Sequence, residues 1–186
     1  MPKSIQTIGI ATVAVVTILA LFVALQPADF RIERSVTIAA PSQAIYGYVN
    51  DLRAMEAWSP YAKMDLAQVN TYSGPATGVG ATCDWQGGQA GRGRMTIVGA
   101  EPGREVDLRL EFFEPLETTN RVRFTLAPAD GATRVTWSME GHNGFVGKAL
   151  GLLLDMDRMV GAEFEKGLTA LKALVESAGH PGEERP

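Results

Sequence analysis

The chain has 186 residues, a formal net charge of -4 and a sequence pI near 5.2, and apolar residues make up 46% of it. This length fits one membrane segment plus one ordinary domain, because compact domains cluster at roughly 100 to 200 residues. Basic residues are scattered among acidic ones rather than gathered into a basic face, which argues against nucleic acid as a partner.

The first segment is a long apolar run. Residues 5–25 contain no charged residue, and at about 1.5 Å rise per residue they match the roughly 30 Å hydrocarbon thickness of a bilayer. This predicts an N-terminal transmembrane anchor over residues 1–28. A cleaved secretory signal is the alternative, but the run exceeds the usual ~7 to 15 residues and no clean small-x-small site precedes Pro27. We expect a single-pass membrane protein with an extracytoplasmic domain.

A strand and two short helices are predicted next. Residues 30–39 alternate apolar and polar side chains with a period of two, and Arg34 is the one exception on the apolar face. From Pro41 onward, apolar residues at helical spacing predict two short helices before Trp58.

Hairpins are predicted after Tyr61, where short runs are punctuated by glycine. The expected antiparallel strands cover residues 68–73, 80–86, 91–99, 105–113, 120–126 and 135–139. Charged residues on their polar face, between positions 107 and 123, are expected to pair across strands as a solvated ladder without function.

The last element is a long amphipathic helix. Apolar residues between positions 145 and 176 recur at intervals of three, four or seven, and residues 178–186 are expected to be a disordered tail. The fold class is therefore α+β, with a seven-stranded curved antiparallel sheet around the C-terminal helix over residues 29–177. Because a twisted sheet bends away from a straight helix, an apolar hollow remains between them.

Several groups of residues carry a family resemblance: residues 36–41, residues 58–61, residues 71–75 with Gly78 and Gly80, residues 131–137, and Phe164, Gly167, Leu168, Leu171 and Lys172. With the order of the elements, they resemble the START-like superfamily, also called SRPBCC, and especially its polyketide cyclase/dehydrase branch. The resemblance covers roughly residues 30–176. It implies a helix-grip fold with a hydrophobic small molecule or lipid in the cavity, and no particular reaction, because the superfamily has no shared catalytic constellation.

Two ionisable residues are candidate catalytic groups. Helical spacing places Asp157 on the stripe that faces the sheet, where desolvation would raise its pKa and suit it to general acid/base chemistry. A structural pair with an arginine is the alternative. His142 lies near the cavity's end and suits proton transfer near neutral pH, but no second residue forms a triad with it.

The remaining predictions concern ligands. The hollow is expected to be lined by aromatic and helix-stripe residues: Trp58, Tyr61, Tyr72, Trp85, Phe112, Phe124, Trp137, Leu153, Asp157, Val160 and Phe164. Cys83 is read as a small buried hydrophobe. With His142, His180 and Cys83 as the only soft ligands, we expect no metal site, and no cofactor is expected.

Three functions follow from these observations. The first is a noncatalytic binding module that holds a hydrophobic small molecule or lipid beside the membrane. The second is a metal-free cyclase or dehydratase that uses Asp157 to move protons on such a ligand. The third is a module that docks on an envelope protein through the last helix or the Trp58 loop.

Overall fold

The computed structural model describes residues 3–65, 67–88 and 91–179. Its helices are α1 (Lys3–Ala24), α2 (Ser42–Val49), the 3-10 helices η1 (Ala54–Ala57) and η2 (Pro60–Lys63), α3 (Phe145–Leu153) and α4 (Met156–Ala178). Its strands are β1 (Asp29–Ile38), β2 (Val69–Ser73), β3 (Thr82–Gln86), β4 (Arg92–Glu101), β5 (Glu105–Glu114), β6 (Thr118–Ala129) and β7 (Ala132–His142).

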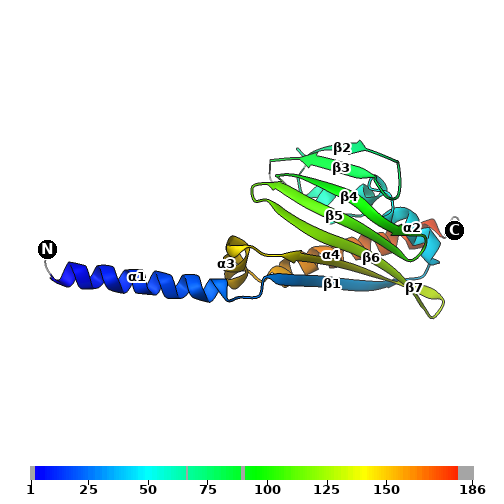
Figure 1. The fold of residues 1–186 in the computed structure, drawn as a ribbon. Helices are drawn as coiled ribbons and strands as arrows, with labels where there is room; N and C mark the ends of the chain where they lie inside the picture. The colour runs from blue at the N-terminus through cyan, green and yellow to red at the C-terminus, as the bar shows by residue number, and fades with distance from the viewer. Residues whose placement is uncertain (1–2, 66, 89–90, 180–186) are drawn as a thin grey trace.

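The seven strands form one antiparallel sheet in the order β1-β7-β6-β5-β4-β3-β2. Strands β2 to β7 are therefore joined as consecutive hairpins, while β1 closes the sheet beside β7 (Figure 1). The α+β class and the seven-stranded antiparallel sheet are as the sequence predicted. β6 and β7 are longer than expected at both ends, and where they meet, positive φ at Asp130 and Gly131 allows a two-residue turn directly between the strands.

The core lies on one face of this sheet. Along β6, the buried residues Val122, Phe124 and Leu126 alternate with more exposed neighbours, and β1 shows the same alternation. Such a period of two places every second side chain on the same face. The face that carries these apolar residues is the one that α4 covers.

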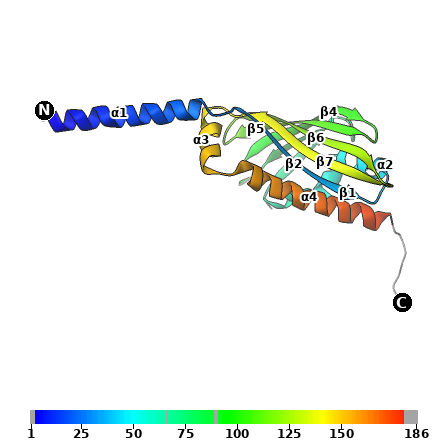
Figure 2. The same ribbon diagram turned by 90° about the horizontal axis from the view of Figure 1, so that it is seen from below.

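Helix α4 lies along the edge strand β1 (Figure 2). Its buried positions include Phe164, Leu168 and Leu171. Near its C-terminal end, the Lys172 ammonium donates to the Thr37 carbonyl over 2.7 Å, and the Ala39 amide donates to the Glu176 carboxylate over 2.8 Å.

Arg34 anchors the other end of α4. Its guanidinium donates to the Asp157 carboxylate and carbonyl at 2.9–3.1 Å and to Glu165 at 3.0 Å. Gly161 makes room for it, because a Cβ there would lie 2.1 Å from Arg34 Nη2. The helix is thus fixed to β1 at both ends. Arg34, the one charged residue on the apolar face of this strand, holds the N-terminal end of α4.

The expectation of one long C-terminal helix over residues 145–176 is wrong. The chain leaves the helical path at Leu154, which is extended at φ -122° and ψ 130°. A second helix begins with Asp155 as its N-cap, whose carboxylate accepts a hydrogen bond from the Arg158 amide. Gly144 is the N-cap of helix α3.

Other expectations differ in detail. Two short helices were expected after β1, but the structure has three, α2, η1 and η2. The predicted disordered tail over residues 178–186 lies largely outside the described residues, whereas Ala178 ends α4.

Helix α1 projects away from the domain beside α3 (Figure 1). Within the described part of the chain, no helix combines the length and apolar character needed to cross a lipid bilayer. The transmembrane anchor expected over residues 5–25 is therefore not supported.

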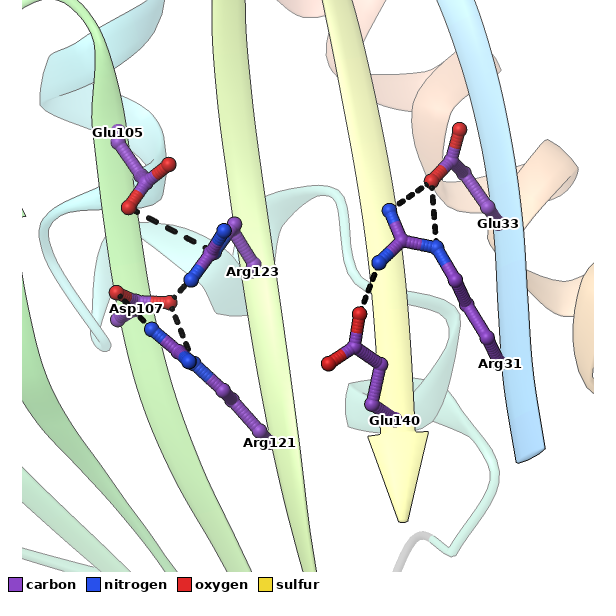
Figure 3. Close-up of polar contacts among 7 residues, drawn as sticks. All are labelled: Arg31, Glu33, Glu105, Asp107, Arg121, Arg123 and Glu140. Carbon is purple, nitrogen blue, oxygen red and sulfur yellow. Dashed lines mark hydrogen bonds and ion pairs between the residues drawn. The ribbon is translucent and has the colours of Figure 1, made fainter. Parts of the chain in front are cut away.

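The outer face of the sheet carries ion pairs (Figure 3). Asp107 accepts hydrogen bonds from Arg121 and Arg123, each at 2.8 Å, while Arg31 contacts both Glu33 and Glu140. Burial opposes ionisation of Asp107, but the hydrogen bonds and charges of the two arginines outweigh it and lower the pKa of this carboxyl. The predicted charge ladder is present, and it occupies the face opposite the core.

One glycine is expected to be indispensable to the sheet. A Cβ on Gly93 would lie 2.1 Å from the Trp85 ring and 2.5 Å from the Glu111 carbonyl oxygen. We expect Gly93→Ala to lower the free energy of unfolding in urea by about 1 to 3 kcal/mol, since the strand or the ring must shift. Gly88→Ala is the matched control, because a Cβ there has open space. Equal effects of the two substitutions would contradict this packing.

Candidate functional site

A cavity of about 1650 Å³ lies between the inner face of the sheet, helices α3 and α4, and the η1–η2 segment. α4 rests against β1, so strands β2 to β5 have little helix over them. Many of the exposed apolar side chains at the cavity's edge belong to α3 and its junction with α4, among them Phe145, Leu150, Leu153 and Met156. The cavity is therefore open at this end.

An aromatic cluster forms the inner wall. Trp137 stacks on Phe164 with ring centroids 4.1 Å apart and an interplanar angle of 8°. Trp58 packs edge-on against Phe124 and Trp137 at 5.7 and 5.5 Å. Tyr61 packs edge-on against Trp137 at 6.3 Å. These contacts hold the rings in fixed positions, as edge-to-face and stacked aromatic pairs do in protein cores.

Glycine allows this cluster to lie close to the helix. A Cβ on Gly167 would lie 2.7 Å from the Trp137 ring. The indole Nε1 of Trp137 is buried and has no hydrogen-bond partner among the described residues, whereas Nε1 of Trp58 donates to the Tyr48 carbonyl at 3.2 Å. A buried donor without a partner is unfavourable, on the order of 1–3 kcal/mol.

The structure brings all of the predicted lining residues to this one cavity. Trp58, Tyr61, Tyr72, Trp85, Phe112, Phe124, Trp137, Leu153, Asp157, Val160 and Phe164 all lie in its wall. Their placement is as the sequence suggested, and their binding of a ligand stays a prediction. Trp85 and Phe112 form a second edge-to-face pair at 5.5 Å, away from the Trp137 cluster.

The candidate Asp157 is not a desolvated acid. Its side chain is 61% exposed and is paired with Arg34. The hydrogen bond from the Arg34 guanidinium, joined by its charge, lowers the pKa of Asp157 below its ordinary value, whereas the sequence led us to expect a raised pKa. The alternative of a structural pair with an arginine describes this geometry.

The candidate His142 lies at the outer end of the cavity. Its Nδ1 is 2.9 Å from the Asp29 carboxylate, and the side chains of both residues are largely exposed, 72% and 93%. His142 and Asp157 both line the cavity, at the end where α3 and the start of α4 lie.

Sequence reasoning missed a polar group in the wall. Asn70 and Tyr72 share one face of β2, and they line the cavity together with Gln68, which directly precedes the strand, and Glu56 of η1. The period of two along residues 68–72 was a usable signal for this shared face. Glu56 carried no such signal, because its approach to β2 depends on the path of the η1 segment.

Burial alters the ionisation of the wall. It raises the pKa of Tyr61 to about 12, with a smaller contribution from the charge of Glu163. Burial and then the hydrogen bond to Glu56 raise the pKa of Tyr72, and burial raises the pKa of the Cys83 thiol. These groups are thus neutral hydrogen-bonding groups at physiological pH. Cys83 is buried, as predicted.

Residues 29–176 match the family model described as "Polyketide cyclase / dehydrase and lipid transport". The chain belongs to this family. The match spans the whole sheet and nearly all of α4, so the resemblance to the START-like (SRPBCC) superfamily is confirmed. A search of curated proteins finds no significant match.

Solved structures share the fold of this polyketide cyclase/dehydrase family member. A solution structure from Thermobifida fusca has 20% identity and a TM-score of 0.60, covering 83% of this chain and 99% of that one. The Aha1 dimer from Colwellia psychrerythraea has 18% identity and a TM-score of 0.56, covering 79% and 96%. DynU16, from the dynemicin biosynthetic locus, has 20% identity and a TM-score of 0.54, covering 80% and 48%. At these identities the likeness shows the fold alone.

The Arg34 attachment gives a pH-dependent prediction. Because the pKa of Asp157 is lowered in the folded protein, the pair stabilises the fold above the pKa of the unfolded carboxyl, about 3.9, and this stabilisation is lost as the pH falls through the folded value. We expect Arg34→Gln to lower the melting temperature by a few degrees at neutral pH and by much less at about pH 2.

Arg158→Gln is the control for this measurement. The Arg158 side chain is exposed and forms no ion pair with the described residues, although it lies on the same turn of α4. A loss of stability in Arg34→Gln that is the same at both pH values would show that the Asp157 pair contributes nothing.

Proposed function

We propose that this family member is a noncatalytic binding module that holds a hydrophobic small molecule or lipid in the cavity between sheet and helices. The observation that carries the proposal is the cavity of about 1650 Å³ with a wall of mainly aromatic and aliphatic side chains. Ligand pockets are usually about 300–1,000 Å³ and largely apolar, so this volume suits a large or elongated guest.

A cyclase or dehydratase is the second candidate, supported by the family's description. Such an enzyme needs an acid or base whose pKa is matched to proton transfer at working pH. Asp157 is exposed and held ionised by Arg34, and His142 is exposed beside Asp29. The geometry of these two candidates therefore favours binding over catalysis.

Filling the cavity tests the binding proposal. Leu110 lies on β5 in the cavity wall, so Leu110→Trp adds bulk to the space a guest would occupy. We expect this substitution to weaken binding of the neutral apolar probe N-phenylnaphthylamine, followed by its fluorescence, at least about tenfold, or roughly 1.4 kcal/mol.

Arg109→Trp provides the matched control, because Arg109 precedes Leu110 on the same strand and its side chain pairs with Glu111 on the outer face. This variant is expected to bind the probe as the unaltered protein does. Absence of probe binding by the unaltered protein, or equal binding by both variants, would refute the cavity as the site.

The proposal also places this module at a lipid membrane. What supports this placement is α1, whose apolar side chains are exposed on successive positions all around the helix: Ile10, Val13, Val15, Val16, Ile18, Leu19, Leu21 and Phe22. α1 meets α3, where Lys148 donates to the Ala24 carbonyl over 3.0 Å. The apolar helix and the open end of the cavity are therefore neighbours. Large exposed apolar surfaces commonly mark sites of membrane or protein contact.

Vesicle flotation tests the membrane placement. We expect the protein to float with phosphatidylcholine vesicles and the double variant Ile18→Asp, Phe22→Asp to stay at the bottom of the gradient, because each carboxylate is unfavourable in hydrocarbon. Val69→Asp is the control, since Val69 is as exposed as these residues but lies on the edge strand β2. Flotation of the double variant would rule out α1 as the contact.

A further inference from the structure

One end of the cavity wall is polar. Glu56 accepts hydrogen bonds from the Tyr72 hydroxyl and, at 3.0 Å, from the side-chain Nδ2 of Asn70, and Oδ1 of Asn70 accepts one from Nε2 of Gln68 at 2.7 Å. All four side chains line the cavity. They lie on η1 and at the β2 edge of the sheet, whereas α4 lies at the opposite edge, on β1.

The Glu56 carboxylate has an unused acceptor. Both hydrogen bonds reach Oε1, and Oε2 receives none from the described residues. The hydrogen bonds from Tyr72 and then Asn70 lower the pKa of Glu56, so the group is ionised at neutral pH. From outside, the Arg53 guanidinium lies 4.2 Å from the centre of the Tyr72 ring, which holds that ring in place. Oε2 is thus a charged hydrogen-bond acceptor, and the neighbouring Tyr72 ring is held in place.

The charge of the wall excludes anionic guests. Among the described residues, the carboxylates of Glu56, Glu117, Asp155 and Asp157 line the cavity, and that of Asp157 is paired with Arg34. The basic residues in the described wall are Arg31, whose side chain pairs with Glu33 and Glu140 on the outer face, and His142, which lies beside the Asp29 carboxylate. A guest that ends in a carboxylate or phosphate would find no free cation there, and an uncompensated charge in an apolar site is unfavourable.

An apolar path leads away from Glu56 across the sheet. Direct strand pairing sets Tyr72 opposite Cys83, Cys83 opposite Met95, and Met95 opposite Leu110. All four residues line the cavity. With neighbouring strands about 4.8 Å apart, the row from β2 to β5 spans about 14 Å. This floor suits an extended hydrocarbon chain whose polar end stays at β2.

We infer that the guest is an apolar chain with a hydrogen-bond-donating end, an amine or a hydroxyl, and that the Glu56 carboxylate binds that end. The inference rests on the proposed binding function and specifies its ligand class. An ammonium gains a charge-assisted hydrogen bond to Oε2, a hydroxyl gains a weaker one, and a carboxylate is repelled. Affinity for chains of equal length should therefore fall from amine to alcohol to acid.

Competition against N-phenylnaphthylamine tests this order. Dodecylamine, dodecanol and dodecanoate are titrated into the full-length protein at neutral pH, with dodecanol below its solubility limit and the two ionic chains below their micelle concentrations. We expect dodecylamine to bind at least about tenfold more tightly than dodecanoate, as a charge-assisted bond of about 1.5 kcal/mol implies. Dodecanol is expected to lie between them.

Glu56→Gln separates charge from shape. Glutamine has nearly the same shape and keeps an oxygen for Tyr72 and Asn70, so the fold should persist, which thermal denaturation verifies. We expect dodecylamine affinity to fall about tenfold and dodecanol affinity by a few-fold at most. Glu117→Gln is the matched control, a second exposed carboxylate in the wall, and should change neither.

The outcomes of these experiments distinguish failure of this inference from failure of the proposed binding function. Equal binding of the three chains, or a loss of amine affinity in Glu117→Gln instead of Glu56→Gln, overturns the role of Glu56 and leaves the cavity as a binding site. Failure of N-phenylnaphthylamine and of every chain to bind overturns the inference and the binding function together.

Discussion

The attachment of α4 to the edge strand β1 is the constraint on which the rest of the structure depends. Arg34 fixes the start of the helix, and Lys172 and Glu176 fix its end. A helix held along one edge of a curved seven-stranded sheet cannot also contact the opposite edge. Strands β2 to β5 therefore keep an apolar inner face with space above it, and this space is the cavity.

The two faces of the sheet carry different kinds of side chain. The inner face packs the aromatic cluster around Trp137 and lines the cavity. The outer face carries paired charges, among which Asp107 bridges Arg121 and Arg123. Exposed pairs on this face, such as Arg31 with Glu33, contribute little stability each, about 0 to 1 kcal/mol, and their charged groups stay in contact with water. The same alternation along each strand thus produces both a charged, solvated outer face and an apolar inner face that lines the cavity.

Much of the fold was predictable from the sequence, because alternation along strands and periodicity along helices are local. The seven strands, their antiparallel order and the residues that share the inner face all follow from such patterns. The break between α3 and α4 was not predictable in this way, since neither glycine nor proline marks Leu154 and Asp155.

For the candidate site, the predictable part was the aromatic lining. The ionisation of Asp157 depended on a contact between residues far apart in the chain, although a signal existed. Arg34 and Asp157 carry opposite charges and lie on two apolar faces that the predicted fold brings together. Pairing them therefore gives each charge a partner of opposite sign. The position of Glu56 beside Asn70 and Tyr72 had no local signal, because it depends on how η1 approaches β2 in three dimensions.

Helix α3 has a consequence for how a guest enters. None of its residues is buried, and it is joined to β7 through Asn143 and Gly144 and to α4 through the extended Leu154. Moving this helix aside breaks its contacts with α1 but takes none of its own side chains out of the core, so this opening requires a far lower free energy than unfolding of the domain. On the proposed binding function, a guest would enter and leave by this route while the sheet and α4 stay intact.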